Sequence, residues 1–123
     1  MTNFLMIASW VGIALTYAIG FGGVFATAKM ADSQNIKLGG PLALGELRVA
    51  LGSNFLALAT ALVWLRSAEL FLVLAAMWAL ATVVKLVSFL LERPPLAQGI
   101  VGVLVDVVMG LLMYSGYLTY ITA

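Results

Sequence analysis

The sequence predicts an all-α integral membrane protein, a bundle of four transmembrane helices arranged up-down-up-down. Of its 123 residues, 64% are hydrophobic and only 9% are charged, with a mean hydropathy of +1.16, whereas about a quarter of the residues in soluble domains are charged. The apolar residues also form four long runs, separated by short polar or proline-containing connections. Residues 1–123 are therefore expected to form one transmembrane domain, with helices at about 4–28, 42–65, 70–91 and 96–120.

The composition excludes several classes of function. A net charge of +1 is too small for electrostatic binding of nucleic acid, which needs a concentrated basic face. The chain has no cysteine and no histidine, which removes disulfides, thiol redox chemistry, iron–sulfur ligation and the usual zinc or haem ligands. Carboxylates on separate helices give no recognisable metal site, so no metal and no cofactor is expected.

The first predicted helix, residues 4–28, contains no charged residue and exceeds the roughly 20 residues that cross a bilayer. A signal peptide is the alternative, but the stretch lacks a basic start and is longer than the roughly 7–15 apolar residues of such a segment. Small residues fall along one side of this helix, which is expected to pack closely on protein. They are Ser9, Gly12, Thr16, Gly20, Gly23 and Thr27.

The second predicted helix, residues 42–65, has a small and polar face that contains Glu46, Ser53 and Asn54. Arg48 points about 160° away from Glu46 at 100° per residue. These two residues therefore cannot form an ion pair within the helix, which requires a spacing of three or four. Arg48 must extend to the membrane interface or meet another helix.

The third predicted helix, residues 70–91, carries Lys85 about two turns from its end and stops at the prolines 94–95, because proline offers no helical N–H. The fourth, residues 96–120, carries Asp106, the most deeply placed charge, about 15 Å along the helix. Three glycines share a face with Asp106 and are expected to pack on a neighbouring helix: Gly99, Gly102 and Gly110.

The charged residues of the second, third and fourth helices all fall in the same half of the predicted bilayer. Because charges in a membrane are tolerated when they pair or line a wet cavity, these residues predict a polar cluster. It would consist of Glu46, Arg48, Ser53, Asn54, Lys85 and Asp106. The cluster can be purely structural, since Arg48 and Lys85 can reach the interface. A short carboxylate at mid-depth cannot, so Asp106 favours a functional role.

Charge also predicts the orientation. Four spans place both termini and Arg66 on one side, with Lys29, Lys37 and Arg93 on the other. The positive-inside rule makes the second side cytoplasmic. We therefore expect a bacterial-type inner membrane protein with both termini outside, in the periplasm.

The run Gly45-Glu46-Leu47-Arg48, followed by Gly52, a base in the third helix and an acid in the fourth, resembles the bacterial domain-of-unknown-function 4345 family. These small four-helix membrane proteins are broadly similar to the DoxX-like group. In that family an aromatic residue precedes a glycine pair, and the later charges are usually arginine and glutamate. At the comparable places this chain has Leu51, Gly52-Ser53, Lys85 and Asp106. The charge signs are kept but bidentate arginine geometry is lost, and the resemblance implies a fold rather than a reaction.

Three functions fit these features. The sequence favours an accessory or scaffold subunit that docks on a larger membrane complex or self-associates, because its glycine-bearing faces are wider than one neighbour needs. A carrier or binder of a quinone- or lipid-like molecule is the first alternative, with a pocket that opens between helices near Glu46, Asn54, Lys85 and Asp106 and has Trp78 and Met109 as walls. A proton-coupled small transporter using Asp106 or Glu46 is the other. No catalytic residue is assigned, since no second catalytic partner has a recognisable spacing. The expected partners are the bilayer, a membrane protein or second copy, and a lipophilic ligand, but not nucleic acid.

Overall fold

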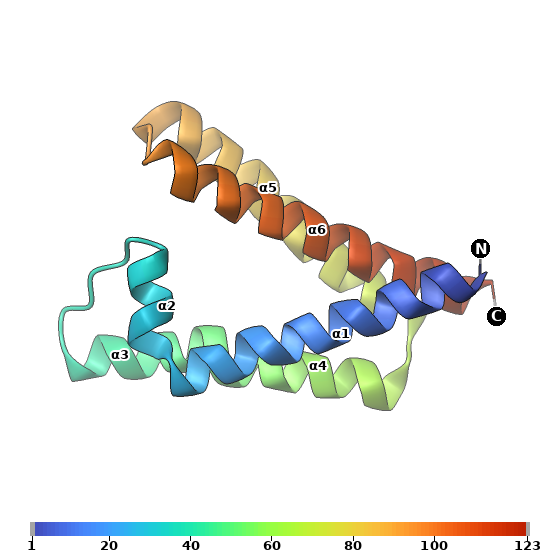
Figure 1. Cartoon of the computed structure of the whole chain (residues 1–123). Coiled ribbons are helices and arrows are strands. Elements are labelled where there is room, and N and C mark those ends of the chain that lie inside the picture. Colours follow the sequence, from blue (N-terminus) through green and yellow to red (C-terminus); the bar gives the residue numbers. More distant parts are fainter. Residues whose placement is uncertain (1, 123) are drawn as a thin grey trace. The chain divides into compact units, whose positions relative to one another are not determined.

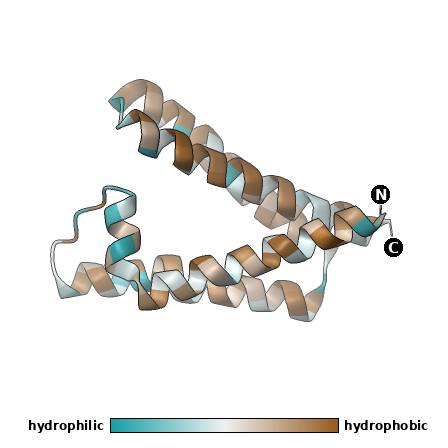
Figure 2. Cartoon of the chain, viewed as in Figure 1, coloured by the Kyte–Doolittle hydropathy of each residue, from teal (hydrophilic) through white to brown (hydrophobic). Residues whose placement is uncertain are grey.

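The computed structural model describes residues 2–122, and these are almost entirely helical. The chain is 88% helix, and the described residues include no strand. Four helical stretches are long and apolar enough to cross a membrane, which confirms the predicted fold class. They are Asn3–Phe25, Pro41–Leu65, Ala68–Glu92 and Leu96–Ile121. Hydrophobic residues cover these stretches, whereas hydrophilic residues gather around the short helix and linker between the first two (Figure 2).

The chain divides into two compact units, which are described in turn. The described part of one unit comprises residues 2–12 and 66–122, and the other unit comprises Ile13–Leu65. The first helix, α1 (Thr2–Phe25), contributes to both units.

The first unit is built on a hairpin of two long helices, α5 (Ala68–Glu92) and α6 (Leu96–Ile121), which lie side by side (Figure 1). Helix α5 begins at Ser67, whose Oγ accepts a hydrogen bond from the Leu70 N–H at 3.4 Å and caps the helix. It ends at Arg93, whose left-handed φ of 48° closes the last turn. The two following prolines prevent the helix from continuing, as the sequence predicts.

Large side chains of α5 pack on small residues of α6. Phe71 lies directly on Gly116, where a side-chain methyl group would overlap the ring, and it stacks on Tyr120 with ring centroids 5.5 Å apart. Trp78 also lies over Gly110, but less tightly, because a side-chain methyl group at Gly110 would meet it at an ordinary contact distance of 3.5 Å. The buried apolar side chains of the hairpin are Phe71, Leu74, Ala75, Trp78, Met109 and Met113.

The start of α1 completes the first unit. Gly12 lies against Met113 and Leu112 of α6. The Arg66 guanidinium lies over the Trp10 ring, 5.5 Å from its centroid, a favourable cation–π distance.

The second unit contains the rest of α1 and the helical stretch after the polar linker. Its further elements are α2 (Thr27–Ser33), α3 (Pro41–Arg48), a π-helical turn η1 (Val49–Ser53) and α4 (Asn54–Leu65). Gly20 and Gly23 of α1 allow close approach to Leu56 and to the Leu51 backbone. The Tyr17 hydroxyl lies 2.9 Å from Thr60 Oγ1, a hydrogen bond between the same two helices.

The first membrane helix ends three residues earlier than the sequence predicts, at Phe25. Ala26 leaves helical geometry, with φ −131°, and Thr27 then opens the separate helix α2. The Thr27 hydroxyl donates to the carbonyls of Gly23 and Val24, at 2.5 and 3.3 Å. A side chain that bonds its own backbone competes with the helical ladder, and Thr27 does so directly after the break. The same kind of bond leaves α5 unbroken at Thr82, so it does not account for the break by itself.

The second membrane helix is interrupted as well. The sequence predicts a continuous helix over 42–65, whereas the structure contains one wider π turn at Val49–Ser53. Gly52, within this turn, is buried against the backbone of Gly23 and Val24. The π turn therefore packs on the last turn of α1, just before the break at Ala26, and such π turns often mark functional or strained positions.

Candidate functional site

The charged centre of the first unit is the ion pair between Lys85 of α5 and Asp106 of α6. Lys85 Nζ lies 2.9 Å from Asp106 Oδ2. The carboxylate side chain is 3% exposed, whereas the lysine side chain is 47% exposed. Gly102 lies beside the ammonium group, and a side-chain methyl group there would meet Nζ at 3.5 Å, an ordinary contact. Asp106 is thus neutralised from the neighbouring helix by a cation that is itself half exposed.

The ion pair leaves the carboxylate incompletely satisfied. Although the ammonium group is close to Oδ2, it does not meet this oxygen in hydrogen-bond geometry, and no other described residue donates to it. A buried acceptor without a donor costs about 1–3 kcal/mol, and such groups are rare in folded proteins. Oδ2 of Asp106 therefore has a charge partner but no hydrogen-bond donor among the described residues.

A groove of about 430 Å³ runs along α5 and α6 and includes Asp106 in its lining. Its floor and walls are mostly alanine, glycine and aliphatic side chains, with few polar groups. They are Leu72, Ala75, Ala76, Ala79, Thr82, Asp106, Val107, Gly110, Leu111 and Tyr114. The volume lies within the range of about 300–1,000 Å³ that is typical of small-molecule sites.

The groove has one charged end. Because α5 and α6 run antiparallel, Thr82 and Asp106 lie at one end, and Leu72 and Tyr114 at the other. The residues from Leu72 to Thr82 span about 15 Å along α5. The Thr82 hydroxyl donates to the Trp78 carbonyl at 3.0 Å, which leaves the Asp106 carboxylate as the polar group in need of a donor. The arrangement suits an elongated apolar molecule with one polar end.

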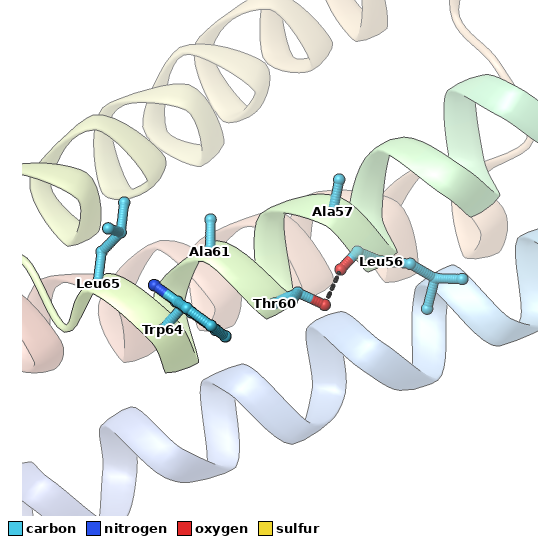
Figure 3. A pocket seen from close by; sticks show the side chains of 6 residues that line it. All are labelled: Leu56, Ala57, Thr60, Ala61, Trp64 and Leu65. Carbon is cyan, nitrogen blue, oxygen red and sulfur yellow. Dashed lines mark hydrogen bonds between the residues drawn. The ribbon is translucent and has the colours of Figure 1, made fainter.

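A second, shallower depression of about 570 Å³ lies on α4 (Figure 3). It is lined by Leu56, Ala57, Thr60, Ala61, Trp64 and Leu65. Thr60 is the one hydroxyl in this set, and it donates to the Leu56 carbonyl at 2.8 Å, the bond drawn in Figure 3. This lining contains no charged residue.

Arg48 meets another helix, one of the two alternatives that the sequence left open. Its Nε donates to the Val24 carbonyl of α1 at 3.0 Å. In a continuous α-helix the amide of residue 28 would bond this carbonyl, but the break at Ala26 interrupts the ladder there. Arg48 therefore supports the broken end of α1.

The other candidates of the second unit are exposed. Ser53 Oγ donates to Val49 O of its own turn at 3.3 Å, and Asn54 begins α4. Glu46 forms no ion pair or hydrogen bond with any described residue. The structure thus brings Lys85 and Asp106 together in one unit and leaves Glu46, Arg48, Ser53 and Asn54 in the other, and the six-residue cluster stays a prediction.

The glycines named for helix packing lie against neighbours within their own units. On α1, Gly12, Thr16, Gly20 and Gly23 are buried. On α6, Gly99 faces the Phe89 ring, Gly102 faces Lys85, and Gly110 faces Trp78. These positions permit close approach of helices inside the chain.

Reasoning from sequence overlooked the walls of the groove. Trp78 and Met109, expected to line a pocket, are instead 8% and 2% exposed within the hairpin core. The lining comes from alanines of α5 and from Tyr114 of α6. One feature of the sequence could have indicated this lining: the alanines at 75, 76 and 79 are small residues within one turn of α5. In the structure they line the groove together with Gly110 of α6.

The four helical stretches that are long and apolar enough to cross a membrane define the class of protein. The chain is a multi-pass α-helical membrane protein. Comparison with protein families, with curated proteins and with solved structures found no match.

Proposed function

We propose that the protein binds a lipophilic small molecule in the groove between α5 and α6. One observation carries this proposal: a buried carboxylate, Asp106, lies at one end of a mostly apolar groove, and its Oδ2 receives no hydrogen bond from the described residues. Apolar pockets with a few convergent polar groups are the usual form of small-molecule sites, including those between helices.

Energetics favour this role over a purely structural one. An ionisable side chain at the centre of a membrane helix costs about 2.5–3.5 kcal/mol on insertion scales. A buried ion pair is weak support for stability, because desolvation offsets much of the attraction. Packing of α5 on α6 is already supplied by Phe71, Trp78 and their glycine partners. The pair is therefore better explained by recognition of a bound molecule.

Mass spectrometry of copurifying lipids tests the proposal. The protein is extracted in mild detergent, and bound lipids are compared between the wild type, Ala76→Leu and Val73→Leu. Ala76 lines the groove, whereas Val73 is an exposed α5 residue outside it, so both variants add leucine bulk at accessible sites. We expect a lipophile that is lost from Ala76→Leu alone. The proposal fails if no lipophile is bound, or if both variants retain it equally.

A second candidate function is supported by the depression on α4. Ala57, Thr60 and Ala61 make a small-residue surface beside the exposed Trp64, of the kind that lets membrane helices approach closely. This surface supports self-association or docking on a larger membrane protein, and the chain would then act as an accessory subunit. Ala61→Leu should lower the fraction of dimer, or of partner-bound protein, in light-scattering measurements if this function holds.

For location, we propose the bacterial inner membrane with both termini outside, because the basic residues between the spans favour a cytoplasmic position for Lys29, Lys37 and Arg93. Membership of the domain-of-unknown-function 4345 family likewise remains a proposal, resting on the run from Gly45 to Arg48.

A further inference from the structure

We infer that the ligand of the α5–α6 groove is a neutral lipophile whose polar end carries a hydroxyl group. This inference rests on the proposed function and names the chemical class of the molecule bound. It concerns what the Asp106 end of the groove accepts and what it rejects.

The first argument is the unmet hydrogen bond. Asp106 Oδ2 is buried and receives no hydrogen bond from any described residue, while Lys85 contributes charge at 2.9 Å. An ionised carboxylate accepts hydrogen bonds and cannot donate them. The polar end of the ligand must therefore supply a donor, which a hydroxyl does and an ether or ester does not.

The second argument is charge. Lys85 and Asp106 neutralise each other, so the groove carries no net charge for a charged ligand to offset. A carboxylate at the ligand's polar end would lie close to Asp106 in surroundings where like charges repel strongly. An alcohol or phenol satisfies the acceptor without adding charge.

The third argument is position. Asp106 lies about 15 Å along α6 from Leu96, near the middle of that span, and the apolar groove extends from it toward Tyr114. A phospholipid keeps its head group at the membrane surface and would place its chain ends, not its polar group, at this depth. A single-chain molecule with one small polar end fits the groove in the required direction.

Movement of the Lys85 side chain would give the ligand's hydroxyl access to the Asp106 carboxylate. The lysine side chain is half exposed and held by a single ion pair, so it can move aside while a hydroxyl approaches the carboxylate. The same ammonium group then faces the oxygen of the bound hydroxyl, which still has lone pairs to accept a hydrogen bond.

Displacement of tritiated dodecanol from the protein in lipid nanodiscs tests this inference. The competitors are unlabelled dodecanol, dodecyl methyl ether and dodecanoate, which share one chain and differ at the polar end. We expect dodecanol to compete at a concentration at least about tenfold lower than the ether, since hydrogen bonds to charged groups are the stronger class. Dodecanoate should compete more weakly than dodecanol.

Asp106→Asn should reduce the preference for alcohol over ether, because the neutral amide is a weaker acceptor. Asp32→Asn removes an exposed carboxylate of α2 and should leave the preference unchanged. Equal competition by alcohol and ether, stronger competition by dodecanoate, or an unchanged preference in Asp106→Asn would each overturn the inference while the groove remains a binding site. Absence of saturable binding, or binding unaffected by Ala76→Leu, would instead overturn the proposed function.

Discussion

Asp106 and Lys85 are the residues whose chemistry most needs an explanation. A half-exposed ammonium group on one helix neutralises an almost fully buried carboxylate on the other, and Oδ2 of this carboxylate receives no hydrogen bond from the described residues. Removing one member of such a pair exposes the other to desolvation without compensation.

Lys85→Met should lower the free energy of unfolding by about 1–3 kcal/mol. This is less than the roughly 3–5 kcal/mol for breaking a fully buried pair, because the lysine is half exposed. The double variant Lys85→Met with Asp106→Asn should recover part of this loss, since the uncompensated charge is gone. Unfolding by SDS titration, followed by circular dichroism, measures both. Equal losses in the single and double variants would show that the two groups are not coupled.

Arg48 forms a hydrogen bond to the end of α1. Its guanidinium donates to a carbonyl that the break in α1 leaves without its helical partner. Arg48→Met should destabilise the protein by about 1 kcal/mol, the value of one such hydrogen bond. Lys37→Met, at an exposed linker position, is the matched control in the same SDS titration. If both substitutions have the same effect, the Arg48 bond contributes nothing.

Individual residues show what the sequence could and could not predict. Asp106 was identified as the most significant charge because depth follows from helical rise alone. Its pairing with Lys85 was one of several possible pairings, because helix positions do not determine which neighbour a side chain meets. The bond from Arg48 to Val24 could not be predicted, because it depends on a break in α1. No proline or charged residue in the sequence marks the position of that break.

At the scale of elements, glycine positions determine how closely α5 and α6 approach. Gly116 lies under the Phe71 ring, whereas a methyl group at Gly110 would meet Trp78 at 3.5 Å, an ordinary contact. Replacing glycine by alanine should therefore affect stability differently at these two positions of α6.

Gly116→Ala should destabilise the protein by about 1–3 kcal/mol through overpacking, because Phe71 has little room to move inside the core. Gly110→Ala should be neutral, or stabilising by up to about 1 kcal/mol through helix propensity. Thermal unfolding in detergent compares the two. A larger loss at Gly110 than at Gly116 would contradict the packing described for the hairpin.

The boundaries of the elements were predictable where chemistry is local. Pro94 and Pro95 end α5 as expected. The early end of α1 and the π turn at Val49–Ser53 were not, because no proline and no charge marks either place in the sequence. The π turn packs on α1 at Gly23 and Gly52, a contact between distant segments that a local pattern does not reveal. Hydropathy, which averages over a window, does not detect either interruption.

At the scale of the whole molecule, composition and the four long apolar runs together predicted a multi-pass all-α membrane protein. Composition could not predict the groove, because a groove depends on which alanines of α5 face which residues of α6. The orientation in the membrane rests on the distribution of basic residues between the spans.

The absence of cysteine makes orientation directly measurable. Gln34→Cys and Thr122→Cys each introduce one thiol at an exposed position near a helix end. In intact spheroplasts, a membrane-impermeant maleimide should label Thr122→Cys, and it should label Gln34→Cys only after lysis. The reverse pattern would place both termini in the cytoplasm.

The central claim is that the α5–α6 groove, ending at Asp106, is the binding site of this protein. Cross-linking with a diazirine-bearing long-chain alcohol in nanodiscs, followed by peptide mass spectrometry, locates the bound molecule directly. We predict saturable labelling of groove residues such as Ala76, Ala79 and Leu111, competed by unlabelled dodecanol. Labelling spread evenly over exposed residues of all four spans, or centred on α4, would contradict the claim.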